Sequence, residues 1–449
     1  MEHDPLNLTG GFYFHENELT ASVQNGLAVF YLLVFLLNVG IAAYYFLSQK
    51  DKLQTIIWGS VAGVFLIHAL AYLAHLGWQL PEGFCVFTTR LMNMYNGQMG
   101  PILYFLLSIV GFAAFLYWRR FFTEPVVALA ILNLSFLAAG WSMTNVEFRL
   151  IVTKEDNVPI VMLIYTVGFF TWLALRLAVL NDERLDRGEP PREKLEDDKV
   201  LVWPDLVYTE MICMIVATFV LVIWAILLKA PLEQPASAAK APNPSKAPWY
   251  FLGLQEMLVY YDPWMAGVVL PTFIIVGLIA IPYIDFNQKG NGYFSFKERQ
   301  FAITMFLFGF VVLWVTLIVL GTFLRGPNWN FYGPFEQWDP HKVLPLNNVN
   351  LSEYFWLFLF GNASILQPGG NWLIRELPGI LLTLGFLILI PPMLAKTCMR
   401  EFYIRMGFVR FFTLVTLIQF MAALPIKMLL RWVINLKYIV YIPELFFNI

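Results

Sequence analysis

Residues 247–284 have the sequence APWYFLGLQEMLVYYDPWMAGVVLPTFIIVGLIAIPYI. Pro248 suits the first turn of a helix, and the apolar helical pattern that follows it is too short to cross a bilayer. Asp262-Pro263 ends this pattern, and the apolar run that comes next is long enough to cross. The sequence therefore predicts a short interfacial helix at 248–261, followed by a membrane-spanning helix at 264–284.

Apolar runs of spanning length recur along the whole chain. Of its 449 residues, 59% are hydrophobic and only 13% are charged, whereas soluble domains are about 45–50% apolar and 25% charged. This composition excludes a water-soluble globular enzyme, and the net charge of -2 excludes a basic nucleic-acid binder. We expect an all-α, polytopic integral membrane protein with about ten transmembrane helices, at 27–48, 57–78, 100–118, 124–144, 159–181, 207–229, 264–284, 301–324, 377–395 and 408–430.

The distribution of lysine and arginine predicts the orientation, because cytoplasmic loops are enriched in these residues. With the N-terminus outside, the inner segments carry more of these residues than the outer segments. The apolar stretch 354–360 is too short to span, and we expect an interfacial or re-entrant element there. The prediction is a multi-pass protein of a prokaryotic cytoplasmic membrane, with both termini on the extracytoplasmic side.

The spacing of the spans and one hydrophilic linker suggest how the chain is organised. The linker contains Glu189-Pro190-Pro191 and many charges of both signs, which is typical of a solvated connector. Five segments follow from this: an outer tail at 1–26, a five-helix membrane domain at 27–182, the cytoplasmic linker at 183–200, a second membrane domain at 201–325, and an outer loop with two further spans and an interfacial C-terminal helix at 326–449.

The short outer helix presents one carboxylate, Glu256, among aromatic residues. Oxidation of a quinol releases two protons and two electrons, and it needs an apolar aromatic slot at membrane depth. A carboxylate whose pKa is raised by burial can accept one of these protons. Glu256 is thus a candidate general base for quinol oxidation. The alternative is that Glu256 faces water on an ordinary interfacial helix.

Residues of about 201–325 resemble a known family. The resemblance begins at Trp203-Pro204-Asp205-Leu206, continues through Pro248-Trp249-Tyr250-Phe251, and covers the two spans that follow. This part of the chain is similar to the C-terminal part of cytochrome b, which stands alone as subunit IV in the cytochrome b6f complex. The resemblance implies a quinol-oxidation site on the positive side of the membrane, with Pro248, Trp249, Tyr250 and Phe251 as quinol-binding residues.

The sequence departs from the family at one decisive position. The family motif is Pro-Glu-Trp-Tyr, and its glutamate is thought to take a quinol proton. In this sequence that glutamate aligns with Pro248. The nearest carboxylate is Glu256, about two helical turns further on. Our hypothesis is that Glu256 has taken over this role. The alternative is an inactive site in a chain that serves only as a scaffold.

The histidines limit which haems the chain can hold. Family members bind two haems b through histidines spaced 14 apart on each of two helices. Here only His68 and His75 are predicted inside a span, on one helix and about 10 Å apart along it. They either contribute ligands to a haem shared with a partner or hydrogen-bond to neighbouring helices. The remaining histidines, which are candidates for contacting an outer haem or are simply solvated, are His3, His15 and His341.

Together these features predict a subunit of a quinol:acceptor oxidoreductase rather than an enzyme alone. The expected cofactor is menaquinone or ubiquinone, with haem b held by partner chains or by shared ligation. No CxxCH motif for covalent haem c and no metal site is present in the sequence. Expected partners are a haem-b-binding cytochrome b6-like subunit, a Rieske iron–sulfur or multihaem c-type cytochrome subunit, and membrane lipids. The first alternative is a non-catalytic scaffold subunit, and the second is an ion-translocating or transporter subunit.

Overall fold

The computed structural model describes residues 19–95, 97–195, 198–228, 235–239, 241–287, 294–344, 347–367 and 370–449. In these parts the chain has ten helices that are long and apolar enough to cross a membrane. The prediction of an all-α polytopic membrane protein with about ten spans is thus confirmed. The spans are Ala21–Gln49, Lys52–Leu73, Met99–Tyr117, Pro125–Ser142, Val158–Asp186, Val202–Leu227, Met265–Ile284, Phe296–Leu324, Leu377–Lys396 and Arg400–Ile434.

Several spans combine more than one helical segment. The first five contain α1 (Ala21–Tyr44) with η1 (Tyr45–Gln49), α2 (Lys52–Leu73), α4 (Met99–Tyr117), α6 (Pro125–Ser142) and α8 (Val158–Asp186). The next three contain η2 (Val202–Leu206) with α10 (Val207–Leu227), η3 (Met265–Val269) with α12 (Leu270–Ile284), and α13 (Phe296–Leu307), η4 (Phe308–Trp314), α14 (Val315–Val319) and η5 (Leu320–Leu324). The last two are α17 (Leu377–Lys396) and α18 (Arg400–Ile434).

Short helices and one small hairpin connect or follow the spans. These elements are α3 (Glu82–Asn93), α5 (Arg119–Phe122), α7 (Val146–Val152), α9 (Arg192–Leu195), α11 (Trp249–Met257), η6 (Pro327–Trp329), α15 (Leu351–Glu353), η7 (Tyr354–Leu359), η8 (Ala363–Leu366), α16 (Trp372–Arg375), β1 (Tyr441–Ile442), η9 (Pro443–Leu445) and β2 (Phe447–Asn448). The strands β1 and β2 pair antiparallel. The short helix predicted at 248–261 is present as α11, which begins at Trp249 and ends at Met257.

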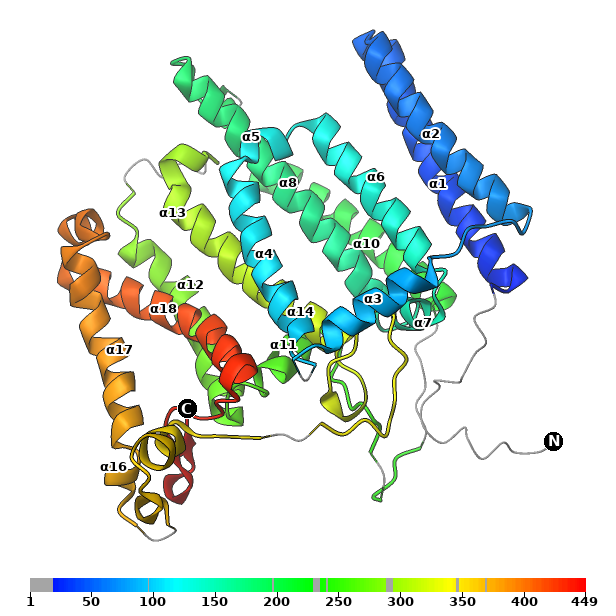
Figure 1. Ribbon diagram of the computed structural model, residues 1–449. Coiled ribbons are helices and arrows are strands. Elements are labelled where there is room, and N and C mark those ends of the chain that lie inside the picture. Colours follow the sequence, from blue (N-terminus) through cyan, green and yellow to red (C-terminus); the bar gives the residue numbers. More distant parts are fainter. Residues whose placement is uncertain are drawn as a thin grey trace.

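The connecting elements alternate between the two ends of the spans. Figure 1 shows α3, α7 and α11 at one end and α5 at the other. The loops that contain α3, α7 and α11, which the sequence places on one side of a membrane, therefore lie at one end of the helices.

Side-chain caps fix where the first two spans begin. Thr20 accepts a hydrogen bond from the Val23 N–H, and Asp51 accepts one from the Gln54 N–H.

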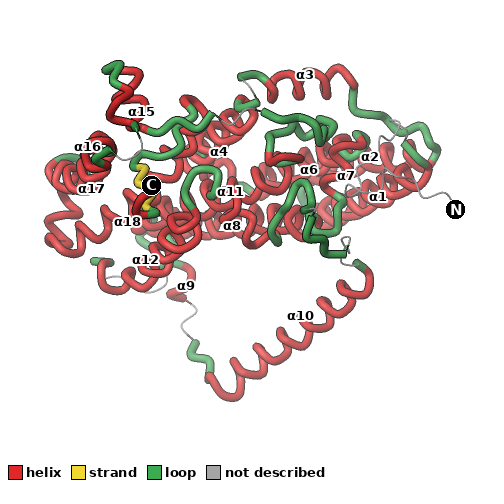
Figure 2. The backbone as a smooth tube through the Cα atoms, turned by 90° about the horizontal axis from the view of Figure 1, so that it is seen from below, coloured by secondary structure: helices red, strands yellow, loops and turns green. Residues whose placement is uncertain are grey.

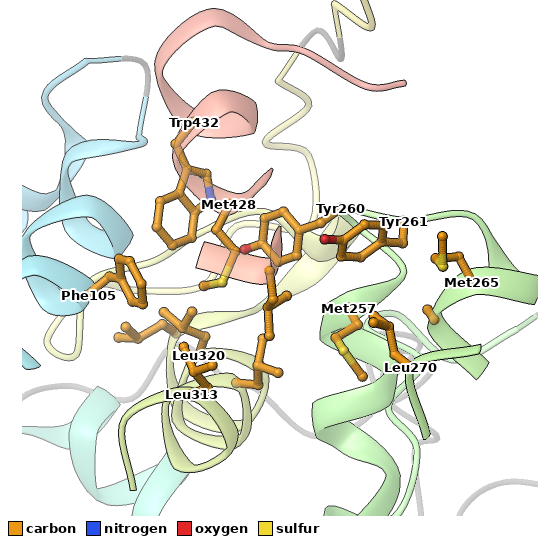
Figure 3. Packing of buried hydrophobic residues seen from close by; sticks show 14 of the residues in the cluster. Phe105, Met257, Tyr260, Tyr261, Met265, Leu270, Leu313, Leu320, Met428 and Trp432 are labelled. Carbon is orange, nitrogen blue, oxygen red and sulfur yellow. The ribbon is translucent and has the colours of Figure 1, made fainter. Parts of the chain in front are cut away.

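One hydrophobic core joins helices from both halves of the sequence. Phe105 of α4 and Tyr260 after α11 each contact the Trp432 ring of α18 edge-on, with ring centroids 5.9 and 5.7 Å apart. Figure 3 shows this packing, which includes Met428 and Leu320. The helix α4 of the first half therefore packs with the second half, so the linker at 183–200 divides the sequence but not the packing.

The helix α10 stands apart from the other helices, as Figure 2 shows. None of its residues is buried, although its most apolar window has a mean hydropathy of 2.5. Because a water-exposed helix of this composition is unfavourable, lipid or another protein must cover it in the membrane.

The structure corrects the prediction of an interfacial C-terminal helix in the segment 326–449. The span α18 continues to Ile434, where Asn435 takes a left-handed conformation and ends the helix. The residues after it form an extended stretch and the β1–β2 hairpin. Arg375 holds this hairpin, since its guanidinium donates to Glu444 at 2.9 and 3.0 Å and to the Tyr441 carbonyl. Backbone groups that a helix would have paired internally are bonded elsewhere, for example the Lys437 N–H to the Val349 carbonyl and the Ile439 N–H to the Ile449 carbonyl.

Candidate functional site

A clamp formed by one side chain fixes the start of α11. The Ala247 N–H donates to Gln255 Oε1 at 2.7 Å, and Gln255 Nε2 donates to the Ser245 carbonyl at 2.7 Å. Pro248 is the N-cap residue, with φ -53° and ψ 148°. The connector ahead of the helix is therefore held against the last turn of α11, and its position relative to the helix is set.

The aromatic residues predicted to bind quinol lie on the exposed side of α11. Tyr250 is 52% and Phe251 53% exposed, and their ring centroids are 4.6 Å apart. Trp249 is half-buried and contacts Tyr250 edge-on at 5.8 Å. These rings form an apolar surface that is exposed on the outside of the chain. Another molecule, such as a partner subunit, is needed to enclose a ligand there.

The opposite side of α11 packs tightly on the end of the spanning helix that finishes at Leu324. Leu252 and Gly253 are buried, and a Cβ on Gly321 would lie only 3.0 Å from the Leu252 side chain. A glycine at position 321 thus permits the close approach of the two helices. This contact holds α11, and with it the aromatic surface, against the end of the span Phe296–Leu324.

Glu256 points into this buried side of α11 and is fully inaccessible to solvent. Arg325 donates from Nε to Oε2 at 3.0 Å and from Nη2 to Oε1 at 2.8 Å. Tyr260 donates its hydroxyl to Oε1 at 2.9 Å. Burial, together with the Glu256 charge, raises the pKa of the Tyr260 phenol well above its ordinary value, so Tyr260 remains a donor. Glu256 is thus a buried carboxylate whose two oxygens are both occupied.

Arg325 extends the ion pair into the long outer loop. Its Nη1 donates to the Trp329 carbonyl at 2.7 Å, and its guanidinium lies 3.5 Å from the Phe331 ring centroid. The bidentate geometry and the aromatic face are arrangements that arginine provides and lysine does not. Sequence reasoning missed this residue, because Arg325 stands alone at the end of a span and no motif links it to Glu256.

Lys246 is a second polar residue of the site that sequence reasoning missed. Its Nζ donates to the Thr322 carbonyl at 2.8 Å and lies 5.1 Å from the Trp338 ring centroid. Burial lowers the pKa of Lys246 to about 7; the charges of Lys154 and Arg325 also lower it, and Glu256 opposes them. The only sequence signal for Lys246 was its place two residues ahead of Pro248.

The structure does not bring the predicted carboxylate and the predicted aromatic surface together on one face. Tyr250 and Phe251 face outward, whereas Glu256 faces the protein interior. The residues on the buried side are joined by contacts among α11, the end of the span Phe296–Leu324 and the outer loop. Chemistry at the aromatic surface therefore needs either a movement of Glu256 or another proton-accepting group.

His68, a haem-contact candidate, is buried in α2. Its Nε2 accepts from the Trp141 Nε1–H at 3.2 Å, so its Nδ1 carries the proton and donates to the Val64 carbonyl at 2.8 Å. The rings of Tyr31 and Trp78 pack against it at 5.1 and 4.8 Å. This environment matches the alternative in which the histidine bonds to neighbouring groups.

The prediction that His75 lies inside the second span is wrong. The helix α2 ends at Leu73, and His75 is exposed with a φ of 57°. The helix stops early because the Tyr72 hydroxyl bonds to the Trp78 carbonyl and folds the chain back. Among the outer histidines, His341 is exposed beside Asp339, and His3 and His15 lie outside the described residues.

Haem b does not fit the residues that the structure describes. In those ranges the spans contain one histidine, and both of its ring nitrogens have partners. Nor do the described ranges contain a group of three or more histidine, cysteine, aspartate or glutamate side chains arranged to hold a metal ion.

A comparison with protein families assigns the segment that carries this site. Residues 235–335 match the family described as cytochrome b (C-terminal)/b6/petD. The match confirms the predicted resemblance, beginning later than the expected residue 201 and ending beyond 325. It contains α11 and both partners of the Glu256–Arg325 pair. No solved structure matches the chain.

Proposed function

We propose that the chain is a membrane subunit of a quinol-oxidising electron-transfer complex of the cytochrome bc or b6f kind, and that it contributes part of the quinol pocket on the outer side. The observation that carries this proposal is the family match over 235–335, with α11 and its aromatic surface inside it. The quinone is menaquinone or ubiquinone. Protons leave on the outer side, and electrons pass to partner chains.

The exposed rings of α11 suit a planar, mostly apolar ligand. Tyr250 and Phe251 offer adjacent aromatic surfaces at the membrane interface, and stacking on such surfaces favours a quinol ring. Since this surface is open, a partner subunit closes the pocket from the other side. Many binding sites lie in this way at an interface between two domains or subunits.

Partner chains supply the redox groups in this proposal. A haem-b-binding, cytochrome b6-like subunit and a Rieske iron–sulfur or multihaem c-type cytochrome subunit would receive the two electrons. The exposure of all of α10 supports the presence of such a partner, because a spanning helix without packing in its own chain is free to contact another subunit. Membrane lipids cover the remaining apolar surface.

Glu256 remains the proposed carboxylate of the site. To accept a quinol proton it would have to separate from Arg325, and breaking a buried, hydrogen-bonded charge pair costs about 3–5 kcal/mol. As the pair stands, it braces α11 against the outer loop. The same observation favours a second candidate function, a scaffold subunit in which the family's glutamate has been lost at Pro248.

The proposed orientation places α11 and both termini on the extracytoplasmic side of a prokaryotic cytoplasmic membrane. It rests on the excess of lysine and arginine in the segments predicted to be inside. Under this orientation, protons from the quinol reach the outer water directly through the connector ahead of α11.

Purification of the intact complex tests the proposal. The complex is isolated from native membranes, its subunits are identified, and its optical spectrum is recorded before and after addition of a short-chain naphthoquinol or benzoquinol. We expect a haem-b subunit to co-purify and its haem to be reduced by the quinol. If no haem-b subunit co-purifies, the proposal fails. If haem is present but the quinol does not reduce it, the scaffold function is favoured.

A further inference from the structure

The loop that leads into α17 has an exposed apolar edge. Its helical element η7 ends in residues 357–360, with the sequence Leu-Phe-Leu-Phe, and all four are exposed. Phe358 alone is 67% exposed. This stretch contains no charged residue, and the quinol site does not use it. A contiguous apolar surface of this kind is unfavourable in water, so lipid or another molecule must cover it.

Two hydrogen bonds hold η7 at the ends of two spans. The Tyr354 hydroxyl donates to the carbonyl of Ile434, which is the last residue of α18. Trp356 Nε1 donates to the Arg375 carbonyl at 2.9 Å, two residues before α17 begins. The element η7 is therefore attached where these spans end, not along their length, which favours an interfacial over a re-entrant position.

The exposed side of α16 continues the exposed side of α17. Glu376 is the one residue between these helices, and its N–H donates to the Trp372 carbonyl while its carbonyl accepts from the Ile380 N–H, both at 2.9 Å. Exposed apolar residues recur at helical spacing through this junction, at Leu373, Leu377, Leu381, Leu384 and Ile388. Because α17 is long and apolar enough to cross a membrane, this stripe meets the hydrocarbon layer and extends from it into α16. Figure 1 shows α16 at the end of α17.

The charged groups next to this edge pair with one another. Arg375 donates from Nε to Glu376 at 3.1 Å and from Nη2 to Glu444 at 2.9 Å. Arg375 and Glu376 are both buried. The edge therefore offers apolar side chains without a free charge beside them, and its attraction to a partner rests on burial of apolar surface.

We propose that this edge binds the lipid surface of the membrane at the end of the spans where α11 lies. The Lys437 amine, just after α18, donates to the Val259 carbonyl, just after α11, at 3.1 Å, so both helices end on the same side. In the proposed orientation this is the outer leaflet. Aromatic and aliphatic side chains at this level are typical of interfacial anchors. The inference does not depend on quinol oxidation. The lipid-binding edge consists of Leu357, Phe358, Leu359, Phe360, Leu373 and Ile374.

Depth-dependent fluorescence quenching tests the proposal with the full chain in vesicles. The three free cysteines are first removed by Cys85→Ala, Cys213→Ala and Cys398→Ala. Phe358→Cys is then labelled with nitrobenzoxadiazole and reconstituted into phosphatidylcholine that carries bromine near the headgroup or near the end of the acyl chain. We expect the label to lose most of its fluorescence, and to lose more with the shallow bromines. Added phosphatidylglycerol or salt should leave the quenching unchanged, because no charge contributes to binding.

Two other labelled positions serve as controls in the same background. His341→Cys reports water, because the His341 side chain is 94% exposed in the outer loop. Leu384→Cys reports the hydrocarbon layer, and its quenching by deep bromines shows that the chain is inserted. A label at position 358 that behaves like the one at 341 overturns the proposal, whether water or a partner protein covers the edge. One that behaves like the label at 384 overturns the interfacial position. Quenching that requires anionic lipid also contradicts the proposal.

Discussion

Arg325 and Glu256, 69 residues apart in the sequence, form two parallel hydrogen bonds at 3.0 and 2.8 Å in the protein interior. Their side chains are 6% and 0% exposed. A charge pair in this environment is sensitive to removal of one partner, since the other charge is then left buried without compensation. The pair connects α11 to the outer loop, so its loss affects both.

Removal of one member of this pair should destabilise the protein. Arg325→Met is expected to cost about 3–5 kcal/mol, and the double variant Glu256→Gln with Arg325→Met should recover most of it, because no buried charge then remains. Thermal unfolding in detergent measures both. Arg187→Met is the control: Arg187 pairs with Glu189 at the surface, and such pairs contribute about 0–1 kcal/mol. A double variant as unstable as the single one would contradict this account.

Truncation of the aromatic surface should weaken quinol binding. Tyr250→Ala is expected to raise KM for a short-chain quinol about tenfold, in line with about 1–1.5 kcal/mol for one aromatic contact. The unfolding temperature should change little, since Tyr250 is 52% exposed. Tyr283→Ala is the matched control, because Tyr283 is 72% exposed at the far end of the following span. Equal effects of the two variants would show that the α11 surface has no special role.

Loosening the Gln255 clamp should destabilise the start of α11. Gln255→Ala removes both hydrogen bonds between this side chain and the connector. Since one intramolecular hydrogen bond contributes about 0.5–1.5 kcal/mol, the free energy of unfolding is expected to fall by about 1–3 kcal/mol. Thermal unfolding in detergent measures this change. An unfolding temperature equal to that of the wild type would show that these bonds do not hold the connector.

His68 should affect stability rather than haem content. Both of its ring nitrogens are hydrogen-bonded. His68→Leu is therefore expected to lower the free energy of unfolding by about 1–3 kcal/mol, mainly because the Trp141 N–H and the Val64 carbonyl lose this partner. The haem spectrum of the complex should stay unchanged. Trp141→Phe, which removes only the donor to Nε2, is a milder control. Loss of a haem band in His68→Leu alone would identify the histidine as a ligand.

The spans and the short outer helix were predictable, because their signals are local. Residues 264–284 form an uninterrupted apolar run, and Asp262-Pro263 separates it from the helix at Trp249–Met257. Composition alone decides such features. The aromatic character of Tyr250 and Phe251 could likewise be seen in the sequence, although which way each side of the helix faces could not.

The remaining parts of the site depend on contacts between distant residues. Nothing near Glu256 in the sequence indicates that Arg325 occupies it, and nothing near Lys246 indicates that the Thr322 carbonyl holds its amine. His75 was misplaced because the apolar pattern continues past Leu73, whereas the bond from Tyr72 to the Trp78 carbonyl turns the chain. The C-terminal hairpin depends on Arg375, which no local pattern connects to Glu444.

The isolation of α10 makes this helix a reporter of its neighbours. Because none of its residues is buried by the chain itself, exchanges among apolar side chains on its surface leave the internal packing energy of the protein unchanged. Any position on α10 where such an exchange impairs the protein in cells therefore marks a point that another molecule touches. A scan of single substitutions along Val207–Leu227 would trace the footprint of that molecule residue by residue.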